Sequence, residues 1–150
     1  GRCLTDMRKR MIDVSDVRIC AGGKISDFKG CMPGILEEVL LAVEQKKPIF
    51  LLGGFGGMSE RICRYLSTKI LPEELTIEWQ LSKSSEYQKT AKDYEAQKID
   101  IDYSKVLSLG ISSLNNGLST EQNNRLFVTP FQDEVITLIS VGLRNLFPEK

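Results

Sequence analysis

Histidine is missing from this sequence of 150 residues. Histidine is the commonest general base and activates the nucleophile of Ser-His and Cys-His systems, so the sequence excludes those catalytic systems. If the chain is an enzyme, carboxylates carry its proton transfers. The four cysteines contain no C-x-x-C pair and have no histidine to complete a zinc site. We therefore expect reduced thiols, no metal and no cofactor.

Long apolar runs and an excess of charge of one sign are also missing. No run approaches the roughly 20 apolar residues that span a bilayer, and the first residues lack the apolar core of a signal peptide. Twenty basic residues balance twenty acidic ones, unlike the cationic composition of nucleic-acid-binding surfaces. We expect a cytoplasmic protein with no membrane and no nucleic-acid partner.

The first half of the sequence reads as two strand-loop-helix units. A β-branched run at 17–21 ends in a double glycine, which predicts a strand followed by a loop. Pro33 then opens a helix with an apolar stripe that runs to about Lys47. The run "PIFLL" is apolar on both faces, as in a central parallel strand, and a second helix is predicted from about Met58 to Lys69. The predicted fold class is therefore α/β with a mainly parallel sheet.

The second half is more polar and less regular. The segment 71–102 is charged, with a mostly solvated helix predicted from about Ser84 to Gln97, and it is either an insertion or a partner-facing arm. Trp79 is its one residue expected in an apolar contact. A turn at 115–117, a helix cap at Ser119 with Gln122, and an amphipathic final helix at about 131–146 complete the prediction.

Glycine-rich loops follow both predicted strands. Loops after parallel strands meet at the carboxyl edge of the sheet, where ligands bind in open α/β proteins. Glycines there expose backbone N–H groups to a phosphate, and a following helix adds its dipole. The alternative is that they only allow a sharp turn. The candidate ligand-binding glycines are Gly22, Gly23 and Gly34 in the first loop and Gly53, Gly54, Gly56 and Gly57 in the second.

Several side chains on these loops are further candidates for ligand binding. Lys24 could neutralise a phosphate or be solvated. Phe55 could stack on a base or ribose, or plug the sheet edge, and Ser59 could donate to an anion. Pro33 belongs to the same first loop, where it starts the helix.

Charged residues near the first loop complete the set. Glu37 and Glu38 could have a structural role only, through a favourable interaction with the positive start of their helix. Alternatively, one of them could bind a ribose hydroxyl or act as general acid or base. Adjacent carboxylates point about 100° apart on a helix, so at most one is expected to face the site. Arg8 and Arg10 also diverge, and either could bind a phosphate or a carboxylate, the alternative being a solvated basic face.

The stretch from Met7 to Leu52, "MRKRM....SDVRICAGGK......GCMPGILEEVLLAVEQKKPIFLL", resembles the SLOG superfamily of Rossmann-like domains. This superfamily includes the LOG enzymes, which release a base from a nucleoside monophosphate. Met7 to Arg10 resemble their M-x-x-R-K segment, and "AGG" and "PGILEE" resemble the two ends of P-G-G-x-G-T-x-x-E. The resemblance places Glu38 at the catalytic glutamate and Arg10 at the catalytic arginine. The first loop is longer, however, and lacks the threonine.

The ordered set of motifs, including the later "NGLS..QN..L", is more similar to the prokaryotic ligand-sensing SLOG domains. The resemblance implies a Rossmann-like three-layer sandwich, a nucleotide or NAD-derived ligand, an effector module (TIR, Sir2 or similar) in the same or an associated chain, a role in anti-phage defence and a homo-oligomer. Such domains begin with a strand and a glycine-rich loop, so residues 1–150 are expected to be the C-terminal portion of one domain, with an insertion at about 71–102.

Three functions follow as hypotheses. The first is a ligand sensor that regulates an effector. The second is a LOG-like phosphoribohydrolase, in which Glu38 assists and Arg10 orients the phosphate. The third is a structural oligomerisation domain whose glycine loops only turn the chain.

Overall fold

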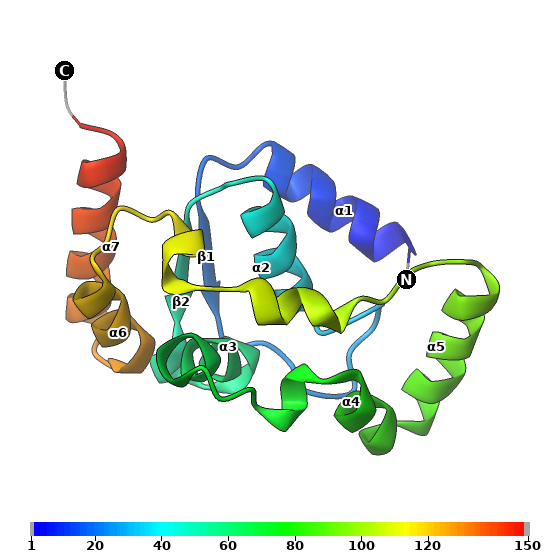
Figure 1. Ribbon diagram of the computed structural model, residues 1–150. Helices are drawn as coiled ribbons and strands as arrows, with labels where there is room; N and C mark the ends of the chain where they lie inside the picture. Colours follow the sequence, from blue (N-terminus) through cyan, green and yellow to red (C-terminus); the bar gives the residue numbers. More distant parts are fainter. Residues whose placement is uncertain (1, 149–150) are drawn as a thin grey trace.

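The structure of the chain is a computed structural model that describes residues 2–148. Most of this part is helical, and α4 and α5 lie at the opposite end of the molecule from α6 and α7 (Figure 1). The helices are α1 (Arg2–Asp13), α2 (Gly34–Glu44), α3 (Gly57–Thr68), α4 (Ile77–Lys83), α5 (Ser85–Ala96), α6 (Thr120–Val128) and α7 (Gln132–Leu146). The strands are β1 (Arg18–Ala21) and β2 (Ile49–Leu52).

The two strands form one parallel sheet, joined through the crossover helix α2. The register pairs Arg18 with Ile49 and Ala21 with Leu52. The predicted strand-helix-strand-helix order is confirmed, and the chain has α/β architecture. Among the described residues the sheet has only two strands, so the broader sheet of a three-layer Rossmann-like sandwich is not seen.

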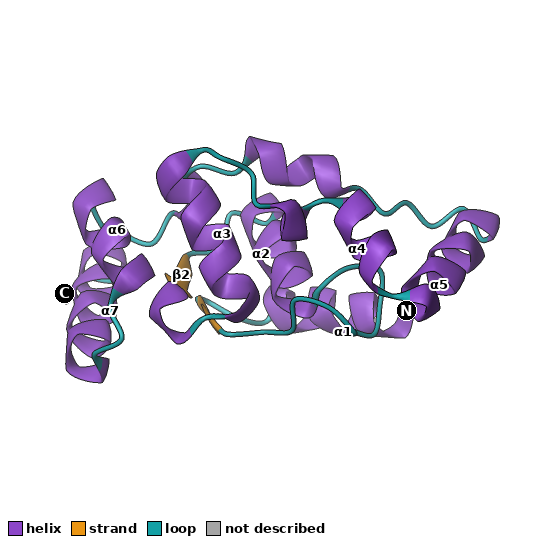
Figure 2. Ribbon diagram, turned by 90° about the horizontal axis from the view of Figure 1, so that it is seen from below, coloured by secondary structure: helices purple, strands orange, loops and turns teal. Residues whose placement is uncertain are grey.

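The sheet separates two hydrophobic clusters. Ile49 and Leu51 point into the larger cluster with α2 and α3, whereas Phe50 and Leu52 point into a smaller one under α6 and α7. All four residues of β2 are buried, which confirms that this strand is apolar on both faces. In β1, Ile19 is 51% exposed, because α6 and α7 contact β2 on that side and leave β1 uncovered. Figure 2 shows both helix groups around the sheet.

The predicted caps and the final helix are present. The Ser119 hydroxyl accepts from the Gln122 N–H at 3.1 Å, and the Gln122 side chain accepts from the Ser119 N–H at 2.9 Å. This reciprocal cap starts α6 at Thr120. Helix α7 buries Val135, and its other inward residues pack on the smaller cluster, as the helical period predicted.

The polar segment 71–102 contains two helices instead of the one predicted. The additional helix, α4, is short and begins where the Thr76 hydroxyl accepts from the Trp79 N–H at 3.3 Å. Trp79 is half-buried, with the Lys83 ammonium 5.4 Å from its ring centroid. Helix α5 is mostly exposed, but two of its tyrosines, Tyr87 and Tyr94, are buried against the rest of the chain.

Candidate functional site

The two glycine loops meet at the carboxyl edge of the sheet and bond to each other. The N–H groups of Met58 and Ser59, in the first turn of α3, donate to the carbonyl oxygens of Gly23 and Gly22 at 3.1 and 2.9 Å. A Cβ on Gly57 would lie 2.5 Å from the carbonyl carbon of Gly22. The first loop therefore occupies two amides that would otherwise point at an anion.

The glycines differ in what surrounds them. A Cβ on Gly53 would lie 2.1 Å from the Phe127 carbonyl oxygen, and one on Gly54 would lie 2.0 Å from that of Thr129. These two glycines let the last turn of α6 and the residue after it approach closely. Gly22 and Gly56 have φ of +63° and +73° and nothing within 4 Å of a Cβ. The faces of Gly22 and Gly56 are thus the open parts of the two loops.

The side chains on the loops also differ in accessibility. Lys24 is exposed, with its ammonium 3.5 Å from the Asp27 carbonyl oxygen. Phe55 is 45% exposed, so its ring does not fill the interior at the sheet edge. Ser59 is fully buried, and its hydroxyl has no hydrogen-bond partner among the described residues. Lys24 and Phe55 can meet a ligand directly, whereas Ser59 cannot in this arrangement.

A buried charged cluster lies where α1 meets the start of α2. Arg8 is only 9% exposed and forms an ion pair with Glu37, whose carboxylate also accepts from the Thr5 hydroxyl. The Arg8 Nε lies 3.9 Å from a carboxylate oxygen of Glu38. The other oxygen of Glu38 accepts from Arg18 of β1, with Nε at 3.1 Å. Both adjacent glutamates therefore face the cluster, although their 100° separation predicted only one.

Glycines make room for the Arg8 guanidinium beside the first turn of α2. A Cβ on Gly34 would lie 2.7 Å from the Arg8 Nη2, and one on Gly30 would lie 3.4 Å from Nη1. Pro33 precedes the helix and provides no side-chain cap, so the first N–H groups of α2 have no capping side chain. The cationic guanidinium of Arg8 and the positive N-terminal end of α2 therefore lie next to each other, which favours the binding of a negatively charged group there.

Arg8, and not Arg10, is the arginine that reaches the glutamates. Arg10 is exposed and makes no ion pair within residues 2–148. The sequence carried a signal for this choice, because Arg8 lies one helical turn before Ile12, which is fully buried. Arg10 lies two positions along the helix from both of them and so falls on another face.

Two buried thiols lie beside the cluster. Burial and, after it, the charge of nearby Glu38 raise the pKa of Cys20 to about 12. Burial likewise raises the pKa of Cys31, whose sulfur lies 3.9 Å from the Thr5 hydroxyl. Both are neutral thiols near pH 7, and the reactive species of cysteine is the thiolate. The cysteines of this region are therefore packing residues and not nucleophiles.

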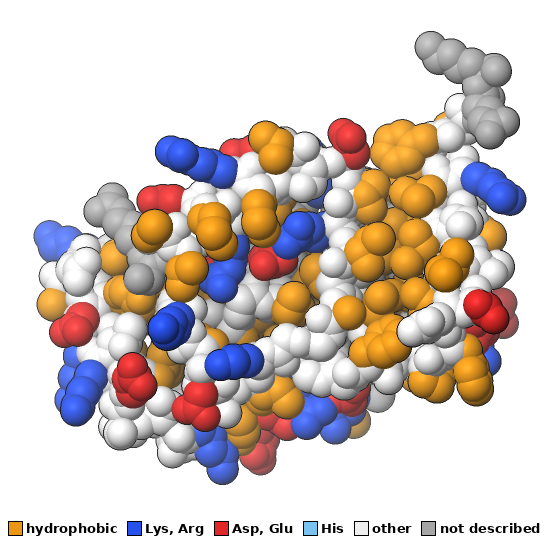
Figure 3. Space-filling model, turned by 180° about the vertical axis from the view of Figure 1, so that it is seen from behind, with side chains coloured by type: hydrophobic (Ala, Val, Ile, Leu, Met, Phe, Trp, Pro, Cys, Tyr) orange, Lys and Arg blue, Asp and Glu red, His pale blue; other side chains and the backbone are white. Residues whose placement is uncertain are grey.

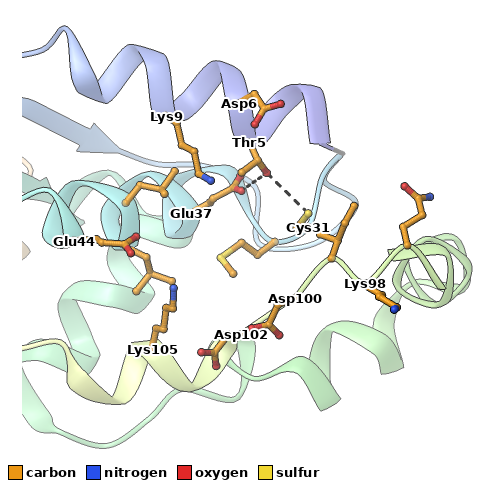
Figure 4. Close-up of a pocket in the computed structure, with 15 residues that line it drawn as sticks. Thr5, Asp6, Lys9, Cys31, Glu37, Glu44, Lys98, Asp100, Asp102 and Lys105 are labelled. Atoms are coloured by element: carbon orange, nitrogen blue, oxygen red, sulfur yellow. Dashed lines mark hydrogen bonds between the residues drawn. The ribbon is translucent and has the colours of Figure 1, made fainter. Parts of the chain in front are cut away.

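A cavity of about 490 Å³ opens next to the charged cluster (Figure 4). Thr5 and Lys9 of α1 and Glu37 of α2 line one side, and the chain from Gln97 to Lys105 lines the other. Sequence reasoning missed this cavity. Its far wall comes from more than 50 residues beyond α2, and no local pattern places that segment.

Neither a metal site nor a membrane span is found in the described part. Within residues 2–148 no three or more Cys, Asp or Glu side chains are grouped so that they could hold a metal ion. None of the described helices combines the length and apolar character that crossing a membrane requires.

Two parallel strands joined by a crossover helix, with glycine loops at their carboxyl edge, define an α/β protein with one candidate site at that edge. The chain belongs to the SLOG family: the family model described as SLOG cluster2 matches residues 1–126. The resemblance inferred from the motifs is thereby confirmed. No curated protein and no solved structure matches the chain.

Proposed function

We propose that this chain is a ligand-sensing domain that binds a nucleotide or an NAD- or ADP-ribose-derived signal. The observation that carries the proposal is the buried Arg8 guanidinium beside the uncapped start of α2, in a chain of the SLOG family. A buried arginine at a helix start binds phosphate through both its charge and its fork of N–H donors.

The ligand would lie between the cluster and the two loops. The phosphate of the ligand displaces Glu37 from Arg8. The released Glu37 carboxylate then accepts hydrogen bonds from ribose hydroxyls. Lys24 supplies a second positive charge from the first loop. The open faces of Gly22 and Gly56 let the ligand approach the backbone, with Phe55 beside them for stacking.

The environment of Glu38 favours a sensor over the LOG-like hydrolase. Both carboxylate oxygens of Glu38 are next to arginines, Arg18 on one side and Arg8 on the other. A carboxylate held by arginines on both sides is poorly placed to exchange a proton with a substrate, which a general acid or base must do. The third hypothesis, a structural domain whose glycine loops only turn the chain, is consistent with the close packing of Gly53 and Gly54. It gives no role, however, to the buried Arg8.

Isothermal titration with AMP, NAD, ADP-ribose and cyclic ADP-ribose tests the proposal. We expect at least one ligand to bind, with affinity that falls in Arg8→Gln and is unchanged in the exposed control Arg10→Gln. If none of the four binds and none raises the melting temperature, the sensor proposal is wrong. Release of free base that disappears in Glu38→Gln would replace it with the hydrolase.

We also propose that the two strands belong to a larger Rossmann-like sandwich, of which residues 1–150 form the C-terminal portion and 71–102 an insertion. The support is β1, which pairs on one side only and leaves Ile19 half exposed. Parallel sheets are normally covered on both faces. Regulation of a TIR, Sir2 or similar effector in bacterial anti-phage defence, a cytoplasmic location and a homo-oligomeric state complete the proposal.

A further inference from the structure

The cavity beside the charged cluster has the size and the inner surface of a nucleoside site. Its volume of about 490 Å³ lies within the range of roughly 300–1,000 Å³ of small-molecule sites. Part of its surface is apolar, from Met32, Leu40 and Leu41. Such a surface accepts a flat ring.

The lining of the cavity carries charge of both signs, with more carboxylates than lysines. Three lysines, Lys9, Lys98 and Lys105, and three carboxylates, Asp6, Glu44 and Asp100, line it without an ion pair among the described residues. Two further carboxylates are already occupied, Glu37 by Arg8 and Asp102 by Ser104. Interleaved donors and acceptors suit the edge of a neutral nucleobase better than a phosphate, which five nearby carboxylates would repel.

The cavity is continuous with the proposed phosphate position through one side chain. Glu37 lines the cavity and also pairs with Arg8. Thr5, which donates to Glu37, lines the cavity as well. A nucleotide with its phosphate on Arg8 and its ribose near Glu37 would therefore direct its base into this cavity.

The far wall of the cavity is held in place by buried polar contacts. The Tyr87 hydroxyl of α5 donates to the Cys31 carbonyl, and it lies 3.4 Å from the Tyr103 hydroxyl. Gln80 of α4, only 1% exposed, donates to the Ile25 carbonyl at 2.9 Å. The segment 71–105 thus holds both the first loop and the cavity wall.

We propose that the nucleobase of the ligand binds in this cavity, between α1, α2 and the segment 97–105. The inference rests on the proposed function, because it assumes that the ligand is a nucleotide. It adds that residues 97–105 contact the base, so that the segment 71–105 reports whether the site is occupied.

The test compares ligands with and without a base. ADP-ribose and AMP carry adenine, whereas ribose 5-phosphate carries only the sugar and the phosphate. Leu41→Trp fills the cavity, and Leu107→Trp is the matched control, since Leu107 is 61% exposed and does not line the cavity. We expect Leu41→Trp to lower the affinity for ADP-ribose and for AMP at least about tenfold and to leave the affinity for ribose 5-phosphate unchanged. Leu107→Trp should change none of the three affinities.

A second measurement uses the unmodified chain, in case Leu41→Trp does not fold. ADP-ribose is expected to slow amide hydrogen exchange in residues 97–105, and ribose 5-phosphate is not. The inference is overturned if ADP-ribose leaves that exchange unchanged, or if a folded Leu41→Trp keeps its affinity for ADP-ribose or loses all three ligands equally. Should the unmodified chain bind none of AMP, NAD, ADP-ribose and cyclic ADP-ribose, the proposed function fails and this inference with it.

Discussion

Arg8 is buried between two glutamates, and this burial determines what its removal would cost. The guanidinium pairs with Glu37 and lies near Glu38 in a place from which water is largely excluded. A buried ion pair adds little net stability, but breaking it leaves a charge without a partner. Stability and the proposed ligand binding therefore depend on the same side chain.

We predict that Arg8→Met lowers the free energy of unfolding by about 3–5 kcal/mol, because Glu37 is left buried and unpaired. Arg10→Met, on the exposed face of α1, changes it by less than about 0.5 kcal/mol. The double variant Arg8→Met/Glu37→Leu recovers most of the loss. Urea unfolding measures all three, and equal effects of the two single variants would contradict the assignment of Arg8.

The cysteines give a second prediction at this scale. Cys3 is exposed, whereas Cys20, Cys31 and Cys63 are buried, and burial raises the pKa of each buried thiol. With iodoacetamide near neutral pH, we expect rapid modification of Cys3 alone, because the other three lack both access and thiolate character. Mass spectrometry of the native and urea-unfolded chain checks this, and all four cysteines react in urea. Rapid native modification of Cys20 would contradict the packing at β1.

At the scale of elements, the contact between the two glycine loops defines the site. Gly57 begins α3 with φ of +68° and touches the first loop through its backbone, whereas Gly56 has a similar φ but faces open space. The two adjacent positions thus both have a positive φ but differ in packing.

We predict that Gly56→Ala costs about 1–3 kcal/mol, because φ of +73° with ψ of −158° is a conformation essentially confined to glycine. Gly57→Ala should cost clearly more, since its Cβ would also push the Gly22 backbone away from α3. Chemical unfolding of both variants measures the difference. Equal losses would mean that the loops are not packed together as described.

The junction of α6 and α7 gives a prediction for pH. Hydrogen bonds from Arg125 and then Thr129 hold the pKa of Glu134 below its ordinary value of 4.5. Because the folded pKa is lowered, this stabilisation is complete above about pH 4.5 and is lost as the pH falls through the folded value. Glu134→Gln should therefore lower the melting temperature near neutral pH, and its difference from the unmodified chain should shrink in acid. A difference that is constant with pH would contradict the ion pair.

The elements were predictable where the signal is local. The glycine pair after β1, the apolar run of β2 and the Ser119–Gln122 cap each indicated a boundary that the structure confirms. Helix α4 and the burial of Tyr87 were not predicted, because a seven-residue helix has little periodicity and the Tyr87–Cys31 contact spans 56 residues. The cavity was missed for the same reason, whereas Arg8 could have been chosen over Arg10 from the helical face that it shares with Ile12.

At the scale of the whole molecule, one face is markedly apolar. Figure 3 shows hydrophobic side chains gathered over β1 and α7. Ile19 on β1 is 51% exposed, and Ile136 on α7 and Phe147 just after it are 62% and 55% exposed. Large exposed apolar patches and unpaired strand edges favour association.

We predict that the 150-residue chain self-associates and that Ile19→Lys or Ile136→Lys reduces this association. Ile70→Lys is the control, because Ile70 is 74% exposed but belongs to the link after α3. Sedimentation velocity at several concentrations distinguishes the outcomes. A monomer at all concentrations would reject the homo-oligomer, and equal effects of Ile19→Lys and Ile70→Lys would reject this face as the place of contact.

The two walls of the cavity come from parts of the chain that are far apart in the sequence, so they can vary independently. One wall comes from α1 and α2, whose residues also hold the buried ion pairs, and the other comes from residues 97–105, which end a polar segment outside the strand-helix units. Substitutions on the second wall leave the buried charges and the glycine contacts intact. Under the proposed function, selection can therefore exchange the ligand by altering a single peripheral segment, while the shared scaffold stays constant.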